Sequence, residues 1–177
     1  MDIFTEYMVK KKKTAQDYLV MTAISVFGTL LVLVLFVLLM GIIPQIASLG
    51  LLVIAGIGYG IYWLITSFNL EFEYSMVNYE IDVDKIINVR RRKRLTTVNI
   101  RGLEAFGTAN GNRHEFESYL KNSNTEKIYA CRDKNDGSVF YAVYQEKEKQ
   151  KMLLFNPNEK MLDTIKKLNP QKAMFTA

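Results

Sequence analysis

The sequence predicts a membrane α-helical hairpin followed by an α+β domain that is mainly β. The first observation behind this fold class is a run of 53 residues, 18–70, without one charged side chain. Each Asp, Lys or Arg at the centre of a membrane helix would oppose insertion by roughly 2.5–3.5 kcal/mol. The second is the alternation of apolar and polar residues that begins at Glu71, a period typical of half-buried strands. We therefore divide the chain into a basic N-terminal segment at 1–17, two transmembrane helices within 18–70 and a cytoplasmic domain at 71–177.

The uncharged run is long enough for two helices. About 20 apolar residues cover the roughly 30 Å of hydrocarbon in a bilayer, so this run exceeds one span. Gly41, Pro44 and Gln45 interrupt it, and proline removes a backbone donor. We expect helices at 18–43 and 46–68. A cleaved signal peptide is the competing interpretation, and it is disfavoured because a signal core has only about 7–15 residues.

The charges that flank the two helices predict their orientation. Four lysines precede the first helix, a basic cluster follows the second at 90–94, and the loop between the helices carries no charge. Positive side chains are retained on the cytoplasmic side, so we expect a multi-pass protein of the cell membrane with both termini in the cytoplasm. The residues assigned to topology and interface are Lys10, Lys11, Lys12, Lys13 and Trp63.

Two segments near or within the helices have alternative interpretations. Residues 2–8 place their apolar side chains on one helical face, which indicates either a short interfacial helix or a frayed terminus. Gly56 and Gly60 have the small-xxx-small spacing that lets helix backbones approach. We expect these glycines to pack against the first helix, and a homo-oligomer interface is the alternative.

The segment from Glu71 onward predicts a sheet-rich domain. Apolar residues at alternate positions predict strands, followed by one amphipathic helix that Asn156 caps, Pro157 opens and Pro170 ends. The loop residues 133–137 predict a hairpin turn. The expected strands are 71–76, 79–84, 95–100, 103–106, 127–132, 139–145 and 151–155, with a short helix at 114–120.

Two segments carry a resemblance to a known fold: YSMVNYEIDV at 74–83 and, after a basic stretch, TVNIRGLEAF at 97–106. With the C-terminal helix, they resemble bacterial pleckstrin-homology-like (PH-like) domains. The resemblance implies a PH-like antiparallel barrel of about seven strands capped by that helix, over about 71–169. The whole chain also resembles two-span membrane proteins of Gram-positive bacteria with a domain of unknown function, which implies no activity. Two features depart from the PH-like pattern: the loop at 107–125 is long, and the lipid-binding arrangement of the eukaryotic relatives is not recognisable as a spaced motif.

The densest charged feature is the basic cluster Arg90, Arg91, Arg92, Lys93 and Arg94. One strand leaves the bilayer near Leu70 and the next returns, so we expect this cluster near the headgroups, where a basic residue can gain about 1 kcal/mol from an anionic leaflet. Three interpretations remain: a solvated hairpin tip that only sets topology, a site for anionic lipid headgroups, and a docking patch for an acidic protein or nucleic acid. Nucleic acid is disfavoured because no aromatic residue interrupts the cluster.

The sequence predicts no catalytic residue, metal site or cofactor. His114 and Cys131 are the only residues of their types, too few for an ordinary structural zinc site. Asp82 and Asp84 alternate outward, as on a solvated strand face. We expect a non-enzymatic membrane protein whose PH-like binding or scaffold domain lies close to the inner leaflet and contacts anionic lipid. The alternative is an accessory subunit of a larger membrane complex, a transporter or envelope-stress assembly, joined to a membrane protein partner through the helix hairpin.

Overall fold

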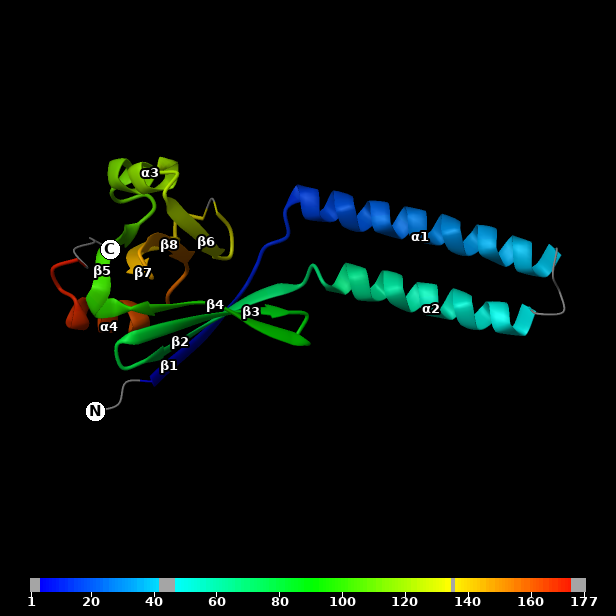
Figure 1. Cartoon of the computed structure of the whole chain (residues 1–177), viewed down its shortest axis with the longest axis horizontal. Coiled ribbons are helices and arrows are strands. Elements are labelled where there is room, and N and C mark those ends of the chain that lie inside the picture. The colour runs from blue at the N-terminus through cyan, green and yellow to red at the C-terminus, as the bar shows by residue number, and fades with distance from the viewer. Residues whose placement is uncertain (1–3, 42–46, 135, 173–177) are drawn as a thin grey trace. The chain divides into compact units, whose positions relative to one another are not determined.

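The computed structural model describes residues 4–41, 47–134 and 136–172, which form two compact units (Figure 1). One unit comprises Lys13–Asn69, and the other joins Met1–Lys12 to Leu70–Ala177. The elements are β1 (Phe4–Lys10), α1 (Ala15–Gly41), α2 (Ala47–Thr66), β2 (Leu70–Val77), β3 (Glu80–Ile87), β4 (Arg91–Asn99), η2 (Ile100–Gly102), β5 (Leu103–Thr108), α3 (Arg113–Lys121), β6 (Thr125–Ala130), β7 (Phe140–Glu146), β8 (Lys149–Phe155) and α4 (Glu159–Leu168).

The helical unit is a pair of apolar helices that run side by side (Figure 1). Helix α1 begins three residues earlier than predicted, at Ala15. The reason is a capping box, in which the Asp17 backbone N–H donates to Thr14 Oγ1 at 3.2 Å and the Thr14 N–H donates to Asp17 Oδ2 at 2.9 Å. The predicted break at 41–45 lies, except for Gly41, outside the described residues.

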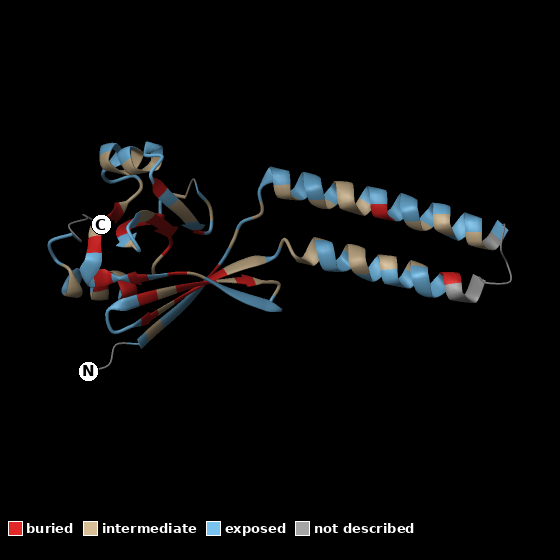
Figure 2. Cartoon of the chain, in the orientation of Figure 1, coloured by how far each residue is buried: buried red, intermediate tan, exposed pale blue. Residues whose placement is uncertain are grey.

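Most described residues of the two helices are exposed or half-buried (Figure 2), and many of the exposed residues are large and apolar. Over Ala15–Leu39, α1 is long and apolar enough to cross a membrane, and Gly50–Thr66 forms a shorter apolar helix. The two helices approach each other closely at Gly28 and Gly50. A Cβ atom at Gly28 would lie 2.4 Å from Ile61 Cδ1, and one at Gly50 would lie 2.4 Å from Leu39 Cδ1.

Sheet A has the strand order β1-β2-β3-β4, with every pair antiparallel. Its edge strand β1 corrects the prediction for residues 2–8, because the described part of that segment is neither an interfacial helix nor a frayed terminus. Side chains at alternate positions of β1 face the core: Val9 is buried, and the Tyr7 ring lies 6.4 Å from that of Tyr74. Because β1 pairs with β2, the whole helical unit is inserted between two adjacent strands.

Sheet B has the order β5-β7-β8-β6, and β6 runs parallel to β8. Residues 133–137 were predicted to form a hairpin turn, and this prediction is wrong because β6 and β7 are not paired neighbours. The described strands therefore form two open four-stranded sheets rather than one antiparallel barrel of about seven strands. The prediction missed β1, the edge strand of sheet A, and the parallel pairing of β6, the edge strand of sheet B, with β8.

Both faces of sheet B are covered. On one face, α4 contributes the fully buried Met161 and Ile165 to a core that also contains the inward residues of sheet A. On the other face, α3 packs through Phe116, whose ring lies 5.5 Å from that of Tyr141. Helix α4 is capped by Asn158, which accepts a hydrogen bond from the Met161 N–H, and not by Asn156 as predicted.

Candidate functional site

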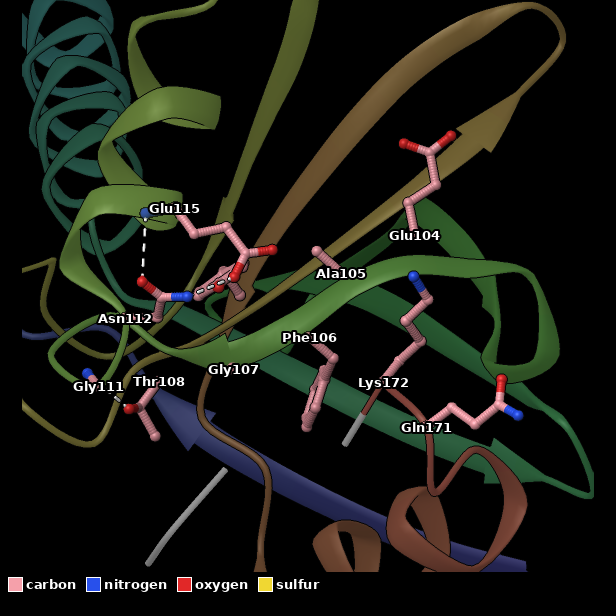
Figure 3. Close-up of a pocket in the computed structure, with 11 residues that line it drawn as sticks. Glu104, Ala105, Phe106, Gly107, Thr108, Gly111, Asn112, Glu115, Gln171 and Lys172 are labelled. Atoms are coloured by element: carbon pink, nitrogen blue, oxygen red, sulfur yellow. Dashed lines mark hydrogen bonds between the residues drawn. The ribbon is translucent and has the colours of Figure 1, made fainter. Parts of the chain in front are cut away.

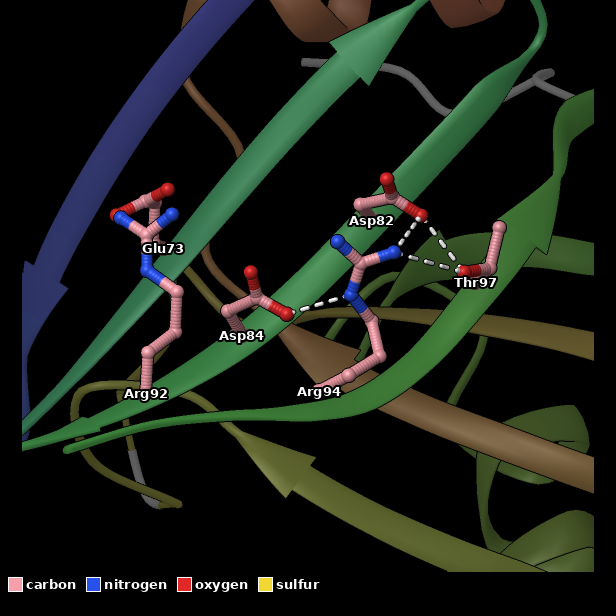
Figure 4. Close-up of polar contacts among 6 residues, drawn as sticks. All are labelled: Glu73, Asp82, Asp84, Arg92, Arg94 and Thr97. Carbon is pink, nitrogen blue, oxygen red and sulfur yellow. Dashed lines mark hydrogen bonds and ion pairs between the residues drawn. The ribbon is translucent and has the colours of Figure 1, made fainter.

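Two arginines of the predicted basic cluster form ion pairs on the outward face of sheet A (Figure 4). Strand β4 begins at Arg91, so most of the cluster lies within a strand rather than in a turn. Arg92 forms an ion pair with Glu73. Arg94 Nε donates to Asp84 Oδ1 at 2.6 Å, and its Nη1 lies 2.8 Å from Asp82 Oδ1. Asp82 and Asp84 are therefore ion-paired rather than merely solvated.

Glu73 is the buried carboxyl of this network, with 4% of its surface exposed. Burial raises the pKa of Glu73, the neighbouring Glu6 and Asp84 raise it further, and the Arg92 guanidinium opposes them. The Arg92 side chain is about half exposed. This pair holds β2 to β4 across β3, which is a structural role for Arg92.

The remaining basic residues of the cluster lie at one end of sheet A. Asn88 and Val89 form the turn between β3 and β4, where the Arg90 N–H donates to the Ile87 carbonyl at 3.0 Å. Arg91 and Lys93, at the start of β4, are exposed. The register pairs Ile87 with both Arg91 and Leu70, the first residue of β2.

The lysines that precede α1 reach the same end. Lys10 pairs with Glu71 in the register of β1 and β2, and the Lys11 N–H donates to the Leu70 carbonyl at 2.9 Å. We call this end of sheet A, at Lys10, Leu70, Ile87 and Arg91, the helix-linked end. Residues 11–14 lead from it to α1, and residues 67–69 lead to it from α2.

A pocket of about 570 Å³ lies beside the last residues of β1. Lys10, Lys11, Lys12 and Arg132 line it together with Asp136. Lys12 is bound there twice, since its N–H donates to the Arg132 carbonyl at 2.8 Å and its Nζ lies 3.5 Å from Asp133 Oδ2. The sequence offered no signal for this pocket, because Arg132 is distant in the chain from the lysines.

Asn156 forms the floor of this pocket and is almost fully buried. Its Oδ1 accepts from the Arg132 N–H at 2.7 Å, and its Nδ2 donates to Ser138 Oγ at 2.9 Å. The Asn156 N–H donates to Tyr74 Oη at 3.3 Å, while that hydroxyl donates to the Ala130 carbonyl. Asn156 thus fixes the ends of β6 and β8 against sheet A.

A family profile described as Bacterial PH-like domain (DUF6106) matches residues 1–175. The chain belongs to this PH-like family. The match includes β1, both helices and both sheets, so the helical insertion is part of the family domain. The family is a domain of unknown function, and no curated protein or solved structure gave a significant match.

A second pocket in the PH-like unit, of about 320 Å³, lies between β5 and the start of α3 (Figure 3). Glu104, Glu115 and Lys172 contribute charged groups to it. Burial and the neighbouring Glu115 raise the pKa of the Tyr141 phenol, which also lines the pocket. Asn112 is committed to capping α3, since its Oδ1 accepts from the Glu115 N–H. This lining contains neither histidine nor cysteine.

The single cysteine and the single histidine of the sequence lie in different segments of the PH-like unit. Cys131 is buried directly after β6, and burial raises the pKa of its thiol, which disfavours the reactive thiolate. His114 is an exposed residue of α3. Within residues 4–41, 47–134 and 136–172, no three His, Cys, Asp or Glu side chains group as a metal site would require.

The glycines predicted to pack against the first helix do not do so. A Cβ atom at Gly56 or Gly60 would meet no described atom within 4 Å, whereas the close contacts of α1 and α2 are at Gly28 and Gly50. Trp63 lies in the last turns of α2 with 39% of its surface exposed. The face of α2 that carries Gly56 and Gly60 is therefore not the face that contacts α1 in the described chain.

Proposed function

We propose that this chain is an integral membrane protein whose helical hairpin holds a non-enzymatic PH-like binding domain against the anionic cytoplasmic leaflet of the cell membrane. The observation that carries this proposal is the insertion of the helical unit between β1 and β2, which are adjacent strands. Two short links, rather than one flexible linker, then tie the domain to the membrane.

The length and exposure of the helices support two membrane spans. Helix α2 has 20 residues and no charge, and 20 residues of α-helix extend about 30 Å, the thickness of the hydrocarbon layer. Phe27 of α1 is 74% exposed and Leu52 of α2 is 70% exposed. Apolar side chains in such numbers on a helix surface favour a lipid environment.

The chemistry of the helix-linked end supports contact with anionic lipid. The basic residues at this end are Lys10, Lys11, Lys12, Arg91, Lys93 and Arg132. Chain connectivity limits their distance from the bilayer, because the three residues of the second link span at most about 11 Å. Each basic side chain close to an anionic leaflet gains about 1 kcal/mol. The ion pairs of Lys10 with Glu71 and Lys12 with Asp133 are exposed, and such pairs contribute little.

The test compares three forms of the full-length protein. We would purify the wild type, R91Q/K93Q and the control K160Q/K167Q, which removes two exposed lysines of α4, in mild detergent and measure bound lipids by native mass spectrometry. We expect enrichment of anionic lipids in the wild type and control, and a clear loss in R91Q/K93Q. Equal anionic lipid in all three forms would overturn lipid contact at this end.

A second candidate function is that of an accessory subunit of a larger membrane assembly. The observation that favours it is the uncovered face of α2 at Gly56 and Gly60, since small residues at this spacing allow a further helix to approach closely. In the same membranes, G56L/G60L should release a partner protein that co-purifies with the wild type. If no protein co-purifies with either form, this candidate loses its support. The partner would be a membrane protein or a second copy of this chain.

A further inference from the structure

The turn between β3 and β4 contains an unfavourable residue. Asn88 has a φ of 47° and Val89 a φ of 58°, and positive φ at both central residues defines a type I′ turn. This turn strongly favours Asn-Gly, because glycine has no Cβ to clash in the left-handed region. Asn88 satisfies the first position. Val89 does not satisfy the second, since a β-branched residue at positive φ is a genuine outlier.

The Val89 side chain does not recover this cost by packing in the fold. It is 82% exposed, more than any other large hydrophobic residue whose burial the structure describes. The turn between β7 and β8 also has two successive residues at positive φ, and there they are the polar residues Lys147 and Glu148, with φ values of 48° and 67°. Polar side chains can therefore occupy two successive left-handed positions in this fold, and the positive φ at position 89 gives no reason for valine.

The position of Val89 suggests where its side chain can be buried. Ile87 pairs with Leu70, so the turn projects from the helix-linked end, beyond the residue at which the second link joins β2. Arg90 and Arg91 follow Val89 directly and are exposed. An apolar side chain beside basic residues is the pattern by which interfacial segments bind anionic bilayers: the apolar group enters the headgroup–acyl boundary and the cations bind phosphates.

We propose that the β3–β4 turn is a membrane-inserting wedge, in which Val89 enters the headgroup–acyl boundary of an anionic bilayer. This inference rests on the proposed function, because it requires the helices to be in the membrane. It adds a residue that is specific for a lipid surface, since a soluble phosphate compound would bind the arginines and leave Val89 in water. Burial in lipid supplies the favourable transfer of the valine side chain that the protein core does not supply.

The experiment measures the depth of three single positions in the full-length protein. In a C131A background, V89C, E148C and L52C each receive a nitroxide label, and the proteins are placed in nanodiscs that contain anionic lipid. Accessibility to oxygen and to a water-soluble nickel chelate then distinguishes lipid from water. We expect labels at 52 and 89 to be more accessible to oxygen and the label at 148 to be more accessible to nickel.

The label at position 52 separates the failure of the two proposals. If position 52 lies in lipid and position 89 lies in water, the wedge is overturned while membrane anchoring stands. If both lie in water, both proposals are overturned. If position 89 lies in lipid in the parent protein and in R91Q/K93Q alike, the wedge stands and the electrostatic contribution of those side chains is overturned.

A second variant tests the wedge without a label. V89N replaces valine by a residue that tolerates the left-handed region, so we expect its thermal midpoint in detergent to rise by about 4 °C. In a C131A background labelled through N88C, the same V89N change should move the neighbouring label toward water in anionic nanodiscs. A lower thermal midpoint would assign Val89 a stabilising role in the fold and overturn the inference.

Discussion

Each end of sheet A has a turn with an asparagine at positive φ, but the residue that follows the asparagine differs between the two turns. At the end away from the helix links, Asn78 is the residue at positive φ, 53°, and Tyr79 beside it is covered by the Arg101 guanidinium, 3.5 Å from the ring centroid. At the helix-linked end, a strained valine and exposed basic side chains occupy the turn. One end thus follows the rules for a stable turn. The other departs from them where the chain connects to the apolar helices.

This comparison requires that β1 is an integral strand of sheet A. Removing β1 should therefore have the largest effect on the stability of the domain. We expect residues 71–177 alone to lose about 4 kcal/mol or more of unfolding free energy, because Val9 and the β1–β2 hydrogen bonds would be missing. Residues 1–11 joined to 70–177 through an Asn-Gly turn should fold. Urea denaturation of the two soluble proteins measures the difference in unfolding free energy. Equal stability would mean that β1 does not contribute to the stability of the domain.

The ion pair on the outward face gives the next largest effect. R92Q leaves Glu73 buried without its guanidinium partner, so we expect a loss of about 2 kcal/mol, less than for a fully buried pair because Arg92 is half exposed. R91Q, one residue away and exposed, should change stability by less than about 0.5 kcal/mol. If denaturation gave the two variants the same stability, the distinction between structural and surface arginines would be wrong.

Placing valine in the turn at the other end of sheet A tests whether a left-handed valine destabilises this fold. N78V places a β-branched residue at a φ of 53° and should lower the unfolding free energy by about 1–2 kcal/mol. The measurement is thermal unfolding of the N78V and wild-type fused domains side by side. A neutral N78V would mean that this fold tolerates left-handed valine without cost, which would remove the premise of the wedge.

The smallest effect is a pH dependence at Glu73. Burial raises the pKa of this carboxyl above its usual 4.5, against the opposing Arg92. The folded chain therefore binds this proton at higher pH than the unfolded chain, so the Glu73 contribution to stability rises as pH falls from neutral toward 4.5 and is lost as pH rises through the folded pKa. Wild type should gain stability relative to E73Q over that window. A gain for E73Q instead would mean that Arg92 outweighs burial.

Local patterns predicted much of the fold. The alternation from Glu71 gave β2 and β3, and the apolar face with Met161 and Ile165 gave α4. What failed was pairing between distant segments. Strand β1 pairs with a strand beyond the whole helical insertion, and its seven residues also fit a helix. The parallel pairing of β6 with β8 is non-local as well and leaves no local sequence signal.

The candidate site was predicted in outline only. Charge alone identified the cluster at 90–94, but it could not separate Arg92 and Arg94, which face acidic neighbours in β2 and β3, from Arg91 and Lys93. That separation depends on strand register, which includes a shift between Val83 and Asp84. Similarly, Asn156 and Asn158 both precede α4, and only the tertiary contacts with Arg132 and Ser138 assign Asn156 to the pocket floor.

The most direct measurement compares the two ends of sheet A in a membrane. Asn78 and Asn88 are matched positions, since each is an asparagine at positive φ in a turn of this sheet. A photoreactive residue at each, in full-length protein in anionic nanodiscs, would report lipid contact as adducts found by mass spectrometry. We predict several-fold more lipid adducts at position 88 than at position 78. Equal yields, or more at 78, would contradict the account that the helix-linked end faces the bilayer.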